Sequence, residues 1–127
     1  MNRKSVASHL KYAETDVPAE AEDMFDYGKV DTVVKRIIDA AHPKMIIVFG
    51  SVANRTAKDG SDLDILVVFD KMESQRDAYL LVKRQFRNLR LPSDVFVMDI
   101  SEFDRWKDDR FSFTHEIVKT GEVVYVN

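Results

Sequence analysis

The chain has 127 residues, of which 45% are hydrophobic and 32% charged, a composition typical of one globular domain with a single core. The formal net charge of −3 argues against a broad basic surface for nucleic acid, and the absence of cysteine excludes disulfides and thiolate zinc sites. The apolar runs are far shorter than the roughly 20 residues that cross a bilayer, so we expect no membrane segment and a cytoplasmic location.

Residues 1–24 are polar and show no clear period, which predicts a flexible N-terminal tail, or alternatively a partner-docking arm, before a single domain over 25–127. The elements predicted within the domain by hydrophobic periodicity are, in chain order, a helix over 27–41, a strand over 45–49, one helical turn over 51–54, a strand over 63–69, a helix over 74–90, a strand over 94–98, helices over 101–106 and 111–119, and a strand over 122–126. This order predicts an α+β (α/β-like) fold with a small mixed sheet flanked by helices.

Two carboxylates, Asp62 and Asp64, stand at the start of a buried strand. Side chains alternate along a strand, so both point to one face, about 6.5 to 7 Å apart. Ionised carboxylates this close repel each other, and a cation such as Mg²⁺ relieves the repulsion. If the next strand pairs alongside, Asp94 completes a cluster that can hold two metal ions for nucleotidyl transfer. A turn aspartate is the structural alternative for Asp62 and Asp94, and Asp99 is a lower-ranked third carboxylate.

Gly50 and Ser51 directly follow the apolar run at 45–49. A glycine allows backbone to approach a phosphate closely, and the Ser51 hydroxyl can donate to a phosphate oxygen. A simple turn after a strand is the alternative interpretation. The fixed distance to the paired aspartates favours a phosphate-binding role.

Gly50-Ser51, ten residues and Asp62-Leu63-Asp64 together form the pattern GSx10DxD. The chain resembles the DNA polymerase β-like nucleotidyltransferase superfamily in this pattern, and in particular the minimal nucleotidyltransferases (MNT), over about 31–125. The resemblance implies the polymerase β-like fold, with Gly50, Ser51, Asp62 and Asp64 binding the nucleoside triphosphate. It also implies that Asp62, Asp64 and Asp94 hold Mg²⁺, with two ions expected, and that Asp94 helps to activate the acceptor hydroxyl.

Many MNT proteins resemble antitoxins encoded beside a HEPN ribonuclease toxin, and some transfer AMP from ATP to a tyrosine of that toxin. The resemblance therefore implies a Mg²⁺-dependent nucleotidyltransferase that uses ATP or another nucleoside triphosphate and has a HEPN-type partner. Two other functions stay open: a catalytically weak module that neutralises a partner by contact, and a small-molecule transferase of the aminoglycoside type. An oligomer is also possible.

The chain departs from the family pattern after GSxA, where Asn54-Arg55 replaces the usual Arg-Gly. Loss of that glycine is expected to stiffen or reshape the loop. Arg55 is a candidate replacement for the missing arginine as a phosphate contact, one residue out of register.

Three further groups of residues are candidate functional sites. Lys83, Arg84, Arg87 and Arg90 are expected to form a solvated helix face, with an acidic or phosphate-bearing partner as the alternative. Core packing is the default for the aromatic residues Phe103, Trp106, Phe111 and Phe113, with partner contact or adenine stacking as the alternative. His115 is a minor candidate for a general base.

Overall fold

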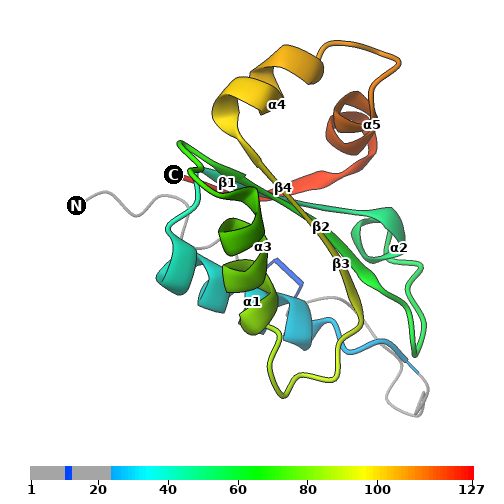
Figure 1. Ribbon diagram of the computed structural model, residues 1–127. Coiled ribbons are helices and arrows are strands. Elements are labelled where there is room, and N and C mark those ends of the chain that lie inside the picture. Colours follow the sequence, from blue (N-terminus) through cyan, green and yellow to red (C-terminus); the bar gives the residue numbers. More distant parts are fainter. Residues whose placement is uncertain (1–10, 13–23) are drawn as a thin grey trace.

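The computed structural model describes residues 11–12 and 24–127. Its helices are α1 (Gly28–Ala41), α2 (Gly50–Ala53), α3 (Gln75–Arg84), α4 (Ile100–Trp106) and α5 (Phe113–Thr120), and its strands are β1 (Met45–Phe49), β2 (Leu63–Phe69), β3 (Ser93–Asp99) and β4 (Glu122–Val126). Figure 1 shows these elements in sequence colours. Within the described ranges, no helix is long and apolar enough to span a membrane.

The strands form one four-stranded sheet in the order β3-β2-β1-β4. β1 pairs antiparallel with β2 on one side and with β4 on the other, whereas β2 and β3 run parallel. The parallel pair requires a crossover connection, which α3 supplies. The predicted α+β fold, a small mixed sheet flanked by helices, is therefore confirmed.

Helices cover both faces of the sheet. α1 and α3 lie against one face, and α4 and α5 lie on the other (Figure 1). The main core cluster contains Val33, Ile65 and Val82, whereas Leu66 and Ile117 belong to a smaller cluster on the α4–α5 side. Consequently β2 is buried along its whole length except at one half-buried position, Asp64.

Helix α3 is shorter than the 74–90 segment that the apolar spacing predicts. It ends at Arg84, and the chain continues in turns closed by hydrogen bonds between residues three apart. Asn88 and Arg90 adopt left-handed φ angles of 66° and 51°, which a right-handed helix does not accommodate. Leu89 still packs on the main core, so the apolar spacing continues beyond the end of the helix.

The last two helices begin at different residues from those predicted. α4 begins at Ile100, one residue before the predicted start, and Asp99 caps it by accepting a hydrogen bond from the Glu102 N–H at 2.9 Å. α5 begins after Ser112, which caps it, and Phe111 lies in the preceding turn. In both cases a neighbouring side chain of the type that caps helices satisfies the free N–H groups of the first turn.

The C-terminal aromatic residues only partly follow the core-packing prediction. Phe103 is 6% exposed and packs in the smaller core cluster. Trp106, Phe113 and Phe111 are 37%, 53% and 87% exposed. α4 and α5 are short, and together they bury too little surface to cover all four rings.

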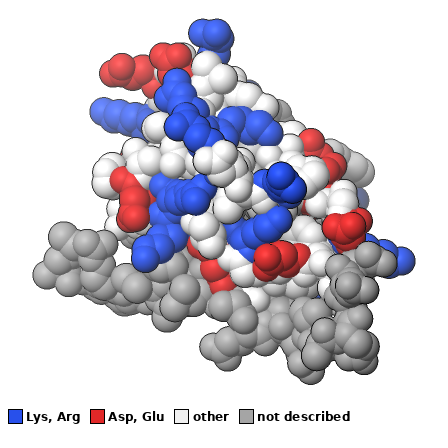
Figure 2. Space-filling view, turned by 90° about the horizontal axis from the view of Figure 1, so that it is seen from below, with Lys and Arg blue, Asp and Glu red and all other residues white. Residues whose placement is uncertain are grey.

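Basic side chains gather on the α1–α3 side of the molecule, seen from below in Figure 2. A shallow hollow of about 430 Å³ lies there, and its lining residues are Arg36, Leu81, Arg84, Gln85, Arg87 and Asn88. Arg36 donates hydrogen bonds to the carbonyls of Gln85 and Arg87, at 3.2 and 3.0 Å. The side chain of Lys83 does not belong to the predicted solvated face. It is half-buried, and its Nζ donates to Ser93 Oγ at 2.9 Å.

Candidate active site

Strand pairing brings two of the predicted carboxylates side by side. Asp64 of β2 lies in register with Asp94 of β3, and Phe49 at the end of β1 lies opposite Asp64. The strand pairing on which the predicted cluster depended is therefore present. Asp64 has the same strand parity as Leu66, so its side chain belongs to the sheet face on the α4–α5 side. The hollow lined by arginines lies beyond the opposite face.

The three predicted carboxylates bring negative charges close together at the start of β2 and β3. Asp64 is half-buried, whereas Asp62 and Asp94 are exposed. Burial raises the pKa of the Asp64 carboxyl, and repulsion from Asp94 and then Asp62 raises it further. A cation that neutralises this charge would stabilise the ionised form of the cluster.

Within residues 11–12 and 24–127, no three acidic or histidine side chains are close enough to hold a metal ion by themselves. Mg²⁺, however, is commonly bound by one or two carboxylates together with substrate phosphates. The charge at Asp64, Asp94 and Asp62 thus fits an ion that arrives with a nucleotide rather than one held in a cage of protein ligands.

Gly50 is packed directly against Asp64. Its φ of +74° lies in the left-handed region, and a Cβ atom placed on it would stand 2.2 Å from Asp64 Oδ2. Only glycine satisfies both the backbone angle and the space. The end of β1 and the carboxylate on β2 therefore meet without an intervening side chain.

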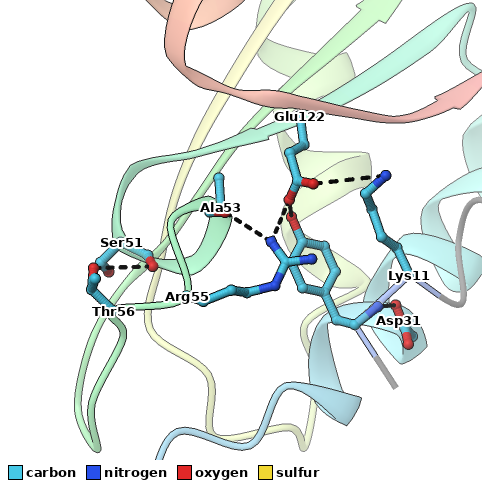
Figure 3. A network of polar contacts seen from close by, with 8 residues as sticks. Lys11, Asp31, Ser51, Ala53, Arg55, Thr56 and Glu122 are labelled. Atoms are coloured by element: carbon cyan, nitrogen blue, oxygen red, sulfur yellow. Dashed lines mark hydrogen bonds and ion pairs between the residues drawn. The ribbon is translucent and has the colours of Figure 1, made fainter. Parts of the chain in front are cut away.

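The short loop after Gly50 is closed by its own backbone. The Asn54 N–H donates to Gly50 O at 3.1 Å, and the Thr56 N–H donates to Ser51 O at 2.9 Å. Thr56 Oγ1 also contacts Ser51 O at 3.4 Å, as Figure 3 shows. These bonds hold Ser51 beside the glycine that touches Asp64.

The guanidinium of Arg55, a candidate phosphate contact, is engaged by residues of the protein itself. Its guanidinium donates to Ala53 O at 2.8 Å, hydrogen-bonds Glu122 Oε1 and lies 4.3 Å from the centre of the Tyr12 ring (Figure 3). Its φ of 62° is left-handed. The chain thus keeps a backbone conformation favoured by glycine at this position, and the side chain contacts of Arg55 offset its cost.

Tyr12 is a buried residue of the segment predicted to be a flexible tail. It is 1% exposed and belongs to the main core cluster. Its N–H donates to Asp31 Oδ1 at 3.0 Å, and its hydroxyl donates to Glu122 Oε1 at 2.7 Å (Figure 3). Lys11 Nζ lies 3.7 Å from Glu122 Oε2. These two residues contact the domain, and most of the rest of the predicted tail lies outside the described residues.

Glu122 connects the loop after α2, the N-terminal segment and β4. Burial would raise the pKa of its carboxyl, but hydrogen bonds from Arg55 and Tyr12 outweigh burial and lower it. Burial, followed by the hydrogen bond to Glu122, raises the pKa of the Tyr12 hydroxyl, so this group remains a donor. The pattern GSx10DxD gives no sign of this network, since its members are far apart in the chain.

Two lesser candidates have other roles. Asp99 lies opposite Phe69 at the far end of the β2–β3 pair and caps α4, so it does not join Asp64. His115 Nδ1 lies 2.8 Å from the Lys107 carbonyl, a contact between α5 and the end of α4. Both residues stabilise the C-terminal helices.

A family model described as "Polymerase beta, Nucleotidyltransferase" matches residues 32–127, which include the candidate active site. The chain belongs to the polymerase β nucleotidyltransferase family. The four-stranded mixed sheet and the five helices formed by the described residues agree with the fold of this family.

No curated protein matches the chain. Among solved structures, a crystal structure of a putative nucleotidyltransferase from Sulfolobus solfataricus is similar over 85% of each chain, with 25% sequence identity and a TM-score of 0.47. General nucleotidyl transfer is the activity that membership of the nucleotidyltransferase family supports.

Proposed function

We propose that the protein is a Mg²⁺-dependent nucleotidyltransferase that transfers AMP from ATP to a hydroxyl acceptor. The observation that carries this proposal is the register of Asp64 with Asp94, beside Gly50. The family match supports the reaction class. The nucleotide, the metal and the acceptor are parts of the proposal.

In the proposed reaction, Gly50 and Ser51 bind the triphosphate, because a glycine lets the backbone approach a phosphate closely and the Ser51 hydroxyl can donate to a phosphate oxygen. Asp62, Asp64 and Asp94 would hold Mg²⁺ together with phosphate oxygens. When bound, Mg²⁺ neutralises phosphate charge and polarises the reacting phosphoryl group.

Asp94 is the proposed base, since it is exposed and lies next to Asp64 on the edge strand. It accepts the proton of the acceptor hydroxyl while the acceptor oxygen forms a bond to the α-phosphorus. The bond from the α-phosphorus to the bridging oxygen breaks, and pyrophosphate leaves with that electron pair. The product is the AMP ester of the acceptor.

We propose further that the acceptor is a tyrosine of a HEPN-type partner protein and that the transfer makes this protein an antitoxin. This part of the proposal is supported by the similarity of GSx10DxD and the small domain to MNT antitoxins. Neutralisation by contact alone is the competing function. The engagement of Arg55 by Glu122 favours it, because the loop then offers one cation fewer to a triphosphate.

The test uses the protein co-produced with the product of the neighbouring reading frame, followed by intact-mass analysis of that partner. The wild type is expected to add one AMP, and Asp64→Asn to add none while keeping the fold. Asp70→Asn is the matched control, because Asp70 is an exposed aspartate just beyond the other end of β2.

Equal AMP addition by the wild type and Asp64→Asn would overturn the proposed reaction. An unmodified partner that Asp64→Asn neutralises as well as the wild type does would establish contact alone as the mechanism. AMP on a small molecule rather than on the partner would assign the small-molecule activity.

A further inference from the structure

Three phenylalanine rings lie next to the carboxylates on the same face of the sheet. Phe96 stands two residues after Asp94 on β3, and Phe49 lies opposite Asp64. Phe113, the first residue of α5, lies over both, with ring centroids 5.2 Å from Phe96 and 5.8 Å from Phe49. The family pattern does not include any of the three.

The outer part of this ring cluster is open to solvent. Phe96 is 38% and Phe113 is 53% exposed, whereas Phe49 is half-buried. The two exposed rings pack against each other, and adjoining exposed apolar side chains on a small domain commonly mark an interaction site.

The position of the rings indicates which substrate they contact. Gly50 and Ser51 follow β1, and β2 separates them from the edge strand β3. The backbone of Phe96 therefore lies about 10 Å, or two strand spacings, from that of β1 and on the strand that carries Asp94, whereas its ring centroid lies 5.9 Å from that of Phe49. The acceptor must approach on this side if Asp94 takes its proton.

We propose that Phe96 and Phe113 form the docking surface of the acceptor and select a hydroxyl carried on an aromatic ring of a polypeptide. This inference rests on the proposed function, and it adds the residues that recognise the acceptor. β3 is an edge strand, so an extended polypeptide can reach the rings without displacing another strand.

The spacing favours an aromatic hydroxyl. Positions two residues apart on a strand are about 7 Å apart, and aromatic rings pack with centroids 4.5–7 Å apart. A phenolic hydroxyl at Asp94 therefore places its own ring within packing distance of Phe96. A serine or threonine hydroxyl at Asp94 brings no ring of its own to pack against Phe96.

The test measures docking separately from transfer. The isotope-labelled protein is titrated, by NMR, with a short apolar peptide containing one tyrosine and with its serine counterpart. We expect the tyrosine peptide to shift the ring resonances of Phe96 and Phe113 and to bind about three- to tenfold more tightly than the serine peptide.

Phe96→Ser and Phe113→Ser are each expected to weaken binding of the tyrosine peptide by about three- to tenfold, with the affinity for ATP unchanged. Tyr79→Ser is the matched control, since Tyr79 is also 38% exposed but lies on α3, on the other face of the sheet. This variant should bind the peptide like the wild type.

Equal binding of the two peptides, or shifts confined to other residues, would overturn the inference. Weaker ATP binding in Phe96→Ser would assign the rings to the nucleobase, and loss of a dimer would assign them to a second copy of the chain. If the wild type docks the tyrosine peptide on the rings but transfers no AMP to any acceptor, the proposed function fails while the docking surface stands.

Discussion

Gly50 and Asp64 determine together how the candidate active site is packed. Position 50 needs a glycine for two reasons. Its φ is left-handed, and a Cβ atom there would lie only 2.2 Å from Asp64 Oδ2. A residue at this position must therefore satisfy a backbone requirement and a steric requirement at once. The energetic costs of the two requirements can be measured separately, because Gly60 has a left-handed φ but open space around an added Cβ atom.

We predict that Gly50→Ala lowers the free energy of unfolding by roughly 2–4 kcal/mol, the sum of a left-handed alanine and a steric collision. Gly60 has a φ of +85° and nothing within 4 Å of an added Cβ, so Gly60→Ala should cost only about 1 kcal/mol. Chemical denaturation of both variants tests this. Equal losses would show that Asp64 moves aside freely.

Arg55 also has a left-handed φ, but it carries a large side chain whose contacts offset the backbone strain. Arg55→Gly and Arg55→Ala both lose the contacts with Glu122 and Tyr12, but only alanine keeps the strain of a φ of 62°. We predict that Arg55→Ala is less stable than Arg55→Gly by roughly 0.5–1 kcal/mol. Thermal and urea unfolding should agree on this order. The reverse order would mean that the loop changes conformation when the arginine is removed.

At the scale of elements, Glu122 joins the start of β4 to the loop after α2 and to the N-terminal segment. Tyr12 and Glu122 are 110 positions apart in the chain and are linked by a hydrogen bond. Arg55 reaches the same carboxylate from the loop. The loop that follows Gly50 and Ser51 is therefore held from outside as well as by its own backbone.

We predict a pH dependence from the lowered pKa of Glu122. A carboxyl whose folded-state pKa is lowered stabilises the fold above its unfolded-state value, near 4.5, and loses this contribution as the pH falls through the folded-state value. The wild type should exceed Glu122→Gln in unfolding free energy by about 1 kcal/mol at pH 7. The difference should shrink below pH 4.5, and Glu73→Gln, at an exposed position, should show neither effect.

Local sequence patterns predicted most of the elements and the carboxylate pair, because apolar runs and GSx10DxD are local signals. The predicted end of α3 at residue 90 was wrong. Leu89 keeps the apolar spacing of a helix, but Asn88 and Arg90 have left-handed φ angles that a right-handed helix does not accommodate. The burial of Tyr12 depends on residues distant in the chain. Helical spacing likewise could not show that α4 and α5 leave Phe113 exposed beside the Phe96 ring.

At the scale of the whole molecule, the two sides of the sheet are unequally stabilised. The main core cluster unites α1, α3 and one face of the sheet, whereas the cluster under α4 and α5 is much smaller. α5 inserts Ile117 into that cluster but leaves Val118 and Phe113 exposed. Local opening requires less free energy where fewer apolar contacts must be broken.

We predict from this imbalance that the amide protons of α5 exchange at a lower free energy of opening than those of β2. Native-state hydrogen exchange at increasing denaturant should show α5 opening in a subglobal step, while β2 exchanges only on global unfolding. A common free energy for both elements would show that the two core clusters unfold as one unit.

Asp94 stands beside Asp64 because of strand register, not because of proximity in the chain. A slip of β3 by one residue would turn Asp94 into the main core and bring the buried side chains of Val95 and Val97 out of it. The burial of these valines therefore also positions the acidic residue. A variant that loses this strand alignment would therefore lose both the burial of the valines and the position of Asp94 beside Asp64.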